Sequence, residues 1–177
     1  MNTPSTGLLA AAALAVAIGG CAALRGTPPP VGSATLAPTQ GNATAGTVRL
    51  EQQADRLMVY ARVTGLKPNA EHGFHVHEKG DCSSPDAMSA GGHFNPTGRP
   101  HGHFGGTDRH AGDLPNLRAD ASGVAEMRVP VTGLVLGSGS ADVVGRAIVV
   151  HAGPDDYTSQ PAGNSGARIA CGVIARS

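Results

Sequence analysis

The stretch Gly73-Phe74-His75-Val76-His77 holds the pattern from which the fold of this chain is predicted. Side chains alternate between the two faces of an extended strand, so Phe74 and Val76 can enter a core while His75 and His77 share the opposite face. Two imidazoles on one face form half of a metal site, but histidines two apart also occur on ordinary surfaces. Seven of the eight histidines fall between His72 and His110, which favours the metal-site interpretation.

The composition of the chain predicts many short strands, and its net charge does not suggest a nucleic acid or an anionic surface as partner. Lys plus Arg and Asp plus Glu each number 13, so net charge gives no indication of a nucleic acid as partner. Glycine is frequent at 26 residues, tryptophan is absent, and β-branched residues recur in short runs between turn residues. This composition is typical of an all-β domain.

Alternating or continuous apolar runs predict about eight strands and no convincing helix, which favours an antiparallel β-barrel or sandwich. Between these strands lie two long loops, of which the first, residues 79–115, has no regular period and is rich in Gly, His, Pro and Asp. A loop of that length inside a compact domain is usually functional or disordered. The expected strands are residues 33–38, 47–51, 57–63, 72–78, 116–120, 124–129, 145–151 and 167–174.

The start of the chain is predicted to be an export signal. Residues 1–20 carry no charge, and residues 8–18 form an apolar run too short to span a bilayer. The run ends in Ile18-Gly19-Gly20-Cys21, which resembles the lipobox of bacterial lipoproteins, although no Lys or Arg precedes it. The alternative, a buried apolar helix, would end abruptly at the glycines and prolines that follow.

This interpretation divides the chain into three parts: a signal peptide in residues 1–20, a lipidated Cys21 with a Pro-rich tether in residues 21–32, and one folded domain in residues 33–177. The protein would be exported and attached to a membrane of the cell envelope, facing the periplasm, by the lipid on Cys21. Lipidation accounts for one of three cysteines and leaves Cys82 and Cys171 as a pair in an oxidising compartment.

Beyond the opening stretch, six short motifs stand out along the chain. They are residues 72–78 (HGFHVHE), 80–82 (GDC), 91–96 (GGHFNP), 110–114 (HAGDL), 150–153 (VHAG) and 166–174 (GARIACGVI). In both content and spacing these motifs resemble those of the copper/zinc superoxide dismutases, and the resemblance extends over nearly all of residues 33–174.

The resemblance implies an eight-stranded Greek-key barrel with a copper and a zinc ion as cofactors. The implied copper ligands are His75, His77, His93 and His151. The implied zinc ligands are His93, His101, His110 and Asp113, so that His93 bridges the two metals. Four imidazoles suit copper in a tetragonal site, and three imidazoles with one carboxylate suit tetrahedral zinc.

The resemblance also implies roles for residues around the metals. His93 and Arg168 would be catalytic, His93 as proton donor and Arg168 as the cation that attracts and orients superoxide. Asp155 would accept hydrogen bonds from His75 and His101, and Cys82 and Cys171 match the family's intrasubunit disulfide. Without the resemblance, Asp155 and Asp113 could be turn residues and Arg168 a surface arginine.

Some residues depart from the family pattern or have no site role in it. Residues 152–167, where the family often carries steering lysines, contain no Lys or Arg, so cations such as Lys79, Arg99 or Arg109 would have to assist Arg168. His72 has the wrong parity to join His75 and is expected to be structural, and His103 is expected to be a solvated loop residue.

The expected reaction is dismutation of superoxide to dioxygen and hydrogen peroxide, which would protect the cell envelope from extracytoplasmic superoxide. Two alternatives remain: a dismutase-like domain that binds metal without turnover, and a zinc hydrolase, for which no catalytic carboxylate is identifiable. The expected partners are superoxide, a membrane bound by the lipid on Cys21, and a second copy of the chain if it forms a homodimer.

Overall fold

An antiparallel sheet forms the body of the domain in this computed structural model, which describes residue 1 and residues 30–177. The predicted signal segment and Cys21 lie outside the described residues. Seven strands follow one another across the sheet in the order β5, β8, β9, β1, β2, β3, β7. Their bounds, in chain order, are β1 Val31–Pro38, β2 Ala45–Gln53, β3 Arg56–Thr64, β5 Phe74–His77, β7 Ala125–Thr132, β8 Ala147–His151 and β9 Arg168–Val173.

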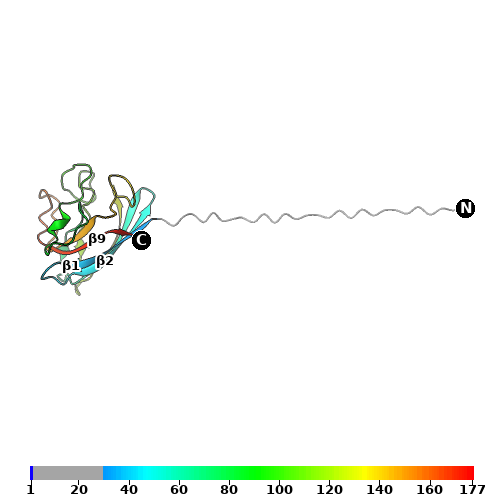
Figure 1. Cartoon of the computed structure of the whole chain (residues 1–177). Coiled ribbons are helices and arrows are strands. Elements are labelled where there is room, and N and C mark those ends of the chain that lie inside the picture. The colour runs from blue at the N-terminus through cyan, green and yellow to red at the C-terminus, as the bar shows by residue number, and fades with distance from the viewer. Residues whose placement is uncertain (2–29) are drawn as a thin grey trace.

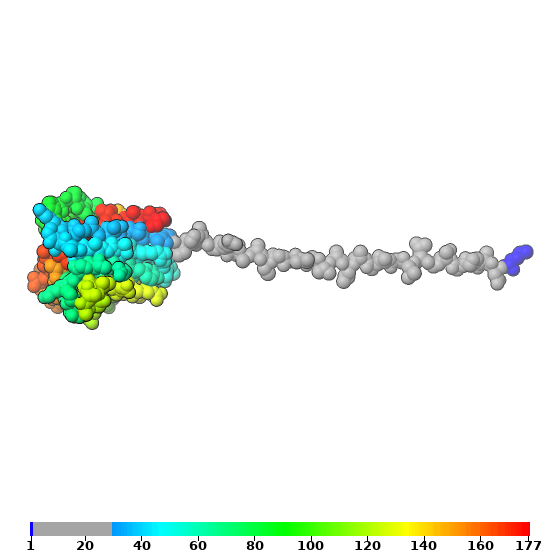
Figure 2. Space-filling view, turned by 90° about the horizontal axis from the view of Figure 1, so that it is seen from below, coloured from blue at the N-terminus to red at the C-terminus, as the bar shows by residue number. Residues whose placement is uncertain are grey.

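Three two-residue strands and one short 3₁₀ turn complete the described elements. β10 (Ala175–Arg176) pairs with β1, while β4 (Glu71–His72) and β6 (Leu117–Arg118) form a separate pair. The turn η1 covers Met88–Ala90. Figure 2 shows the red C-terminal residues against the blue first strand, as the pairing of β10 with β1 requires. No helix in residues 30–177 is long and apolar enough to cross a membrane.

The predicted all-β Greek-key class is confirmed, with two differences in how the strands are arranged. Strands β1, β2 and β3 follow one another as hairpins, whereas β9 and β8 return to the other side of β1, which is consistent with a Greek key (Figure 1). Within residues 30–177 the sheet curls without closing, because its end strands β5 and β7 are not hydrogen-bonded neighbours. The described strands also number ten rather than about eight.

Local chemistry explains where strands begin and end. β1 includes Val31 and Gly32, which the sequence assigns to the tether, because Val31 pairs with Glu51 and Gly32 with Leu50. The strand expected at residues 116–120 shrinks to β6, since Asn116 binds the backbone of Asp155 and Asp120 closes a turn onto Val124. The strand expected at residues 72–78 divides at Gly73, whose N–H donates to Gly153 O at 2.8 Å rather than continuing one ladder.

The core lies on the concave side of the sheet and is made by alternate side chains. Leu36, Val48, Leu50, Val59 and Phe74 are among its buried members. Every side chain of β5 is buried, because Phe74 and Val76 enter this core while His75 and His77 are covered from the other side by the two long loops. A strand buried on both faces gives the site a rigid base.

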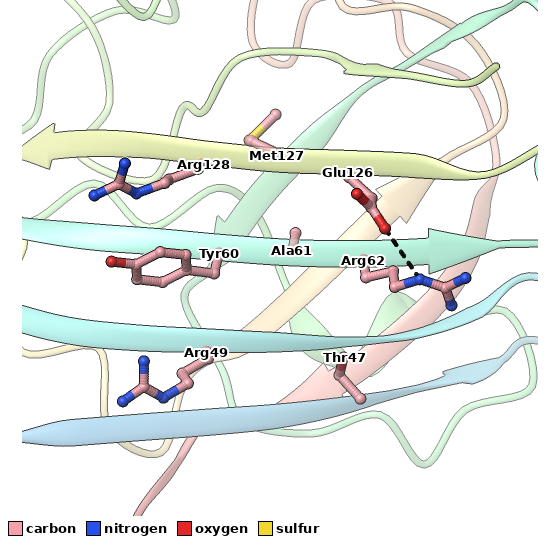
Figure 3. Close-up of a pocket in the computed structure, with 8 residues that line it drawn as sticks. All are labelled: Thr47, Arg49, Tyr60, Ala61, Arg62, Glu126, Met127 and Arg128. Carbon is pink, nitrogen blue, oxygen red and sulfur yellow. Dashed lines mark hydrogen bonds and ion pairs between the residues drawn. The ribbon is translucent and has the colours of Figure 1, made fainter.

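The outward face of β2, β3 and β7 carries a shallow groove of about 360 Å³, shown in Figure 3. Arg49 and Arg128 flank the Tyr60 ring, and Arg62 pairs with Glu126 at 3.2 Å. None of the residues that line this groove belongs to the histidine clusters described next.

Candidate metal centre

Two histidine clusters that share one residue form the centre. The ligand atoms offered within each cluster all lie within 4.8 Å of one another, and every member is buried. The first cluster is His75, His77, His93 and His151, and the second is His93, His101, His110 and Asp113. The structure therefore brings together all seven residues for which the sequence predicted metal ligation.

Different elements position the two clusters. His75 and His77 lie on β5, and His151 ends the neighbouring strand β8. The other members come from the loop of residues 78–116, which returns to β5 through bridges of His77 with His93 and of His75 with Asp113. The first cluster is thus mostly strand-borne, and the second depends on the loop.

Hydrogen bonds fix the ring tautomers of the strand-borne histidines. His75 Nε2 lies 2.8 Å from Asp155 Oδ2, His77 Nδ1 lies 2.9 Å from Gly91 O, and His151 Nδ1 lies 3.2 Å from Gly166 O. Carbonyl and carboxylate oxygens only accept, so these ring nitrogens must carry the protons. The opposite nitrogens, His75 Nδ1, His77 Nε2 and His151 Nε2, are left with lone pairs, and all are buried without a hydrogen-bond partner.

His93 differs from these residues because both of its ring nitrogens belong to the clusters. Its Nδ1 lies 2.8 Å from Asp113 Oδ1, inside the second cluster. Its Nε2 is buried without a partner, and its ring stacks on His75 with centroids 3.9 Å apart. One imidazole therefore connects the two clusters.

The buried imidazole lone pairs show whether these residues fit a bound metal ion. Buried polar atoms in native proteins are almost always satisfied, and each unsatisfied atom requires an explanation. Here four unpartnered imidazole nitrogens occur in the first cluster alone, at His75, His77, His93 and His151. A bound metal ion satisfies all of them at once, so the residues fit the copper site that the sequence predicted.

Burial keeps the first cluster neutral and ready to bind metal. It lowers the pKa of His75 and His77, that of His93 to about 4 and that of His151 to about 3. Neutral imidazoles have lone pairs available at physiological pH, as metal ligation requires.

The second cluster contains the charged member. Burial opposes ionisation of Asp113, but hydrogen bonds from His101, His110 and His93 hold the pKa of its carboxyl well below the usual range. Burial likewise opposes the charged form of His101, yet the carboxylates of Asp113 and Asp155 raise its pKa to about 9. Three imidazoles around one carboxylate form the donor set of a closed zinc site.

Asp155 links the clusters from outside. One carboxylate oxygen lies 2.8 Å from His75 Nε2 and the other 2.9 Å from His101 Nε2, which is the arrangement that the sequence resemblance implied. The carboxylate is fully buried, and the backbone N–H of Asp155 donates to Asn116 Oδ1 at 2.9 Å. Asp155 thus orients one ring of each cluster.

Arg168 lies beside the first cluster and lines an open pocket. Its guanidinium donates to Ala87 O at 2.7 Å and to Gly91 O at 2.6 Å. Together with His151 and the loop between β8 and β9, it lines a pocket of about 440 Å³. Burial lowers the pKa of Arg168, but a guanidinium stays charged at neutral pH.

The suggested steering role of Arg109 is wrong. Arg109 is buried, and its guanidinium donates to the carbonyls of His110, Ala111, Asp113 and Thr132. It therefore supports the backbone of the second cluster instead of facing solvent. Arg99 is exposed and pairs with Asp108 at 3.3 Å, and neither Arg99 nor Lys79 lines the pocket.

The remaining predicted residues are also placed. Cys82 and Cys171 form a disulfide with Cα atoms 5.8 Å apart. His72 is buried outside both clusters with Nδ1 2.9 Å from His151 O, and the exposed His103 packs its ring on Tyr157. Gln160, which the sequence interpretation did not single out, forms two hydrogen bonds with the backbone of His101, and no sequence signal identified it.

An all-β domain with two histidine clusters joined through His93 defines a binuclear metalloprotein. The family model described as copper/zinc superoxide dismutase (SODC) matches residues 44–174. The chain therefore belongs to the copper/zinc superoxide dismutase family, and copper and zinc are its cofactors.

Relatives carry the name of this family, and a solved structure shares the fold of this chain. The chain is 43% identical over 145 residues to superoxide dismutase [Cu-Zn] 2 of Aquifex aeolicus, covering 80% of this chain and 84% of that protein. It is 42% identical over 134 residues to the superoxide dismutase-like protein YojM of Bacillus subtilis, covering 73% of this chain and 68% of that protein. The crystal structure of the clock protein EA4 superposes with a TM-score of 0.76 at 39% identity, covering 84% of this chain and 96% of that one.

Proposed function

We propose that the first cluster binds copper and the second binds zinc, with His93 ligating both. The support is chemical: four buried neutral imidazoles suit copper, and three imidazoles with the ionised Asp113 suit zinc. As a member of its family, the chain is an enzyme, a copper/zinc superoxide dismutase. The observation that best supports the proposed centre is that His93 belongs to both clusters, because one residue then joins a redox site to a closed structural site.

Bound copper supplies the one-electron chemistry by which one superoxide is oxidised to dioxygen and a second is reduced to peroxide, while zinc supplies only charge and geometry. Formation of peroxide requires protons. The Nε2 atom of His93 faces the first cluster and has no hydrogen-bond partner. We assign it two alternating roles, as a copper ligand and, when it is not ligated, as the atom that holds and delivers one proton. Asp113 lies 2.8 Å from the other ring nitrogen, Nδ1, and as fellow ligands of zinc the two side chains would keep this imidazole oriented.

Arg168 is proposed to bind the anion. It is the one cationic residue that lines the pocket containing His151, within the described residues. Its two backbone contacts hold the guanidinium in place, and a guanidinium has five N–H donors, so others remain for superoxide. A locally placed positive charge attracts an anion even where the net charge of the chain is zero.

We further propose that the enzyme acts outside the cytoplasm and protects the cell envelope. The disulfide between Cys82 and Cys171 supports an oxidising compartment, and the lipobox-like run ending at Cys21 supports a lipid anchor. A Cys21→Ser variant should then move from the membrane to the soluble fraction. Equal distribution of both forms would remove the anchor from the proposal.

The metal assignment can be tested one cluster at a time. His77 belongs only to the first cluster and His110 only to the second. Under limited metal supply, His77→Ala should lose copper and keep zinc, and His110→Ala should do the reverse. Loss of the same metal from both variants would contradict the assignment, as would loss of neither.

A binding domain without turnover is the alternative, because one relative carries the name of a superoxide dismutase-like protein. The presence of all seven ligand candidates together with Arg168 favours the enzyme.

Assembly into a homodimer is also proposed. Sedimentation of the metal-loaded protein should give twice the mass of the mature chain, and a monomer at micromolar concentration would contradict this proposal.

A further inference from the structure

The loop between β8 and β9 contains a compact turn built around Asp156. Its carboxylate accepts hydrogen bonds from Thr158 N at 2.9 Å, from Ser159 N at 2.7 Å and from Ser159 Oγ at 2.6 Å. The turn closes where Gly163 N donates to Ser159 O and Asp156 N donates to Gly163 O. A turn fixed at this many points presents the next side chain, Gln160, in one direction.

Gln160 is bound to both backbone groups of His101. The N–H of His101 donates to Gln160 Oε1 at 2.9 Å, and Gln160 Nε2 donates to His101 O at 2.8 Å. One planar side-chain amide thus satisfies a donor and an acceptor of the same residue. Such a pair fixes the backbone position of His101 more tightly than either bond would alone.

The same loop also holds the ring of His101. Asp155 Oδ1 lies 2.9 Å from His101 Nε2, which leaves His101 Nδ1 on the side of Asp113. A Cβ atom at Gly163 would collide with the Asp155 carboxylate, so only glycine allows the loop to close here. His101 is therefore held by its ring through Asp155 and by its backbone through Gln160.

Gln160 also lies at the rim of the pocket that contains His151 and Arg168. A single side chain thereby joins a member of the second cluster to the rim of the anion pocket. In Figure 1 the orange loop between β8 and β9 lies beside the green loop that follows β5, and Gln160 and Asp155 make the contacts between them that reach His101.

We propose that Gln160 is a positioning residue that sets His101 for zinc and ties the rim of the anion pocket to the zinc site. This inference rests on the proposed assignment of His101 as a zinc ligand. Without the amide, the backbone of His101 is fixed only by its chain neighbours, and zinc should leave faster. The rim should also loosen, which should weaken binding of a small anion.

The test replaces Gln160 by methionine, which has similar length and no amide. Gln52 offers a matched control, because its Oε1 accepts from Leu136 N at 3.0 Å and its Nε2 donates to Ala54 O at 3.0 Å, and neither Gln52 nor these partners belong to a cluster. Zinc release from fully loaded protein to a chromophoric chelator should be on the order of tenfold faster in Gln160→Met. Gln52→Met should release zinc at the wild-type rate.

Two further readouts separate positioning from general loss of stability. Cobalt bound in place of zinc should show altered visible absorption bands in Gln160→Met, and azide should bind the loaded variant more weakly. The melting temperature of the metal-free variant should stay near that of the wild type. Faster release accompanied by an equal loss of metal-free stability in both glutamine variants would overturn the proposal.

A His101→Ala variant distinguishes the two possible failures. If His101→Ala loses zinc while Gln160→Met retains it at the wild-type rate, the role of Gln160 is wrong and the zinc assignment stands. If His101→Ala binds zinc as tightly as the wild type, the zinc assignment itself is wrong.

Discussion

His77 and Arg168 donate hydrogen bonds to the same carbonyl oxygen, that of Gly91, across 2.9 Å and 2.6 Å. A copper-ligand candidate and the proposed anion-binding cation are therefore positioned by one backbone atom. Gly91 adopts a positive φ of 74°, and a Cβ there would collide with the Glu78 side chain. The backbone at this point consequently favours glycine, and the position of the Arg168 guanidinium relative to His77 depends on it.

Replacing Arg168 by alanine should slow superoxide turnover. We expect kcat/KM to fall roughly tenfold or more, because electrostatic steering accelerates association by that order. The dependence of the rate on ionic strength should also become flatter, since screening acts on the charge that was removed. Arg128→Ala, in the groove of Figure 3 that contains no member of either cluster, is the matched control and should keep both properties. An unchanged salt profile in Arg168→Ala would count against a steering role.

Replacing Asp155 by asparagine should weaken binding of both metals. An amide can accept from only one of the two histidines through its single oxygen, so His75 or His101 loses its orientation. Affinities should fall about 10- to 100-fold, as for other residues that orient metal ligands. Competition with chelators measures this, and Asp120→Asn, which alters only a remote turn, serves as control. Wild-type affinity for both metals would contradict the role given to Asp155.

Removing the disulfide should destabilise the protein and loosen the anion site. Cys82 and Cys171 are separated by 89 residues, and loss of a native disulfide typically costs about 2 to 5 kcal/mol. For a domain of this size the melting temperature should fall by roughly 10 °C. Cys82 precedes the Ala87 and Gly91 carbonyls, and Cys171 follows Arg168 by three residues, so turnover should fall as well. Calorimetry of the Cys82→Ala/Cys171→Ala variant that shows no shift would disprove this account.

The metal-free protein should be most stable near pH 6.5. Burial lowers the pKa of His93 to about 4 and of His151 to about 3, so the unfolded state binds more protons below pH 6.5, and stability falls as the solution is acidified. The raised pKa of His101, about 9, acts in the opposite direction: its contribution is complete below pH 6.5 and is lost as pH rises through 9. The melting temperature of chelator-treated protein should thus decline both below and above pH 6.5.

Zinc should remove the alkaline decline, because it replaces the proton on His101. A metal-free stability that is flat from pH 6.5 to 9 would show that His101 is not held in its charged form by Asp113 and Asp155. The zinc-loaded protein, melted over the same range, provides the comparison.

The sequence predicts the ligand set well for physical reasons that are local. His75 and His77 share a face because strand side chains alternate, and the spacing of His93, His110 and Asp113 matched a known family. The same alternation predicts most strands, since Leu57–Val63 and Thr47–Glu51 lie within β3 and β2.

Features that depend on the folded loops could not be predicted from residue type alone. The charge of Arg109 suggests a steering cation, but the side chain lies inside the loop and donates hydrogen bonds to backbone carbonyls. No sequence pattern identifies Gln160, because its side chain binds the backbone of His101, which lies 59 residues away along the chain. Strand ends at Gly73 and Asn116 were likewise decided by side-chain and backbone contacts with distant segments.

Superoxide decay followed on purified protein with its copper and zinc quantified tests the central claim most directly. Protein that contains about one copper and one zinc per chain should accelerate decay to a rate near the diffusion limit expected for this class of enzyme. Full loading of copper and zinc without acceleration of decay would contradict the account and leave a metal-binding domain in its place.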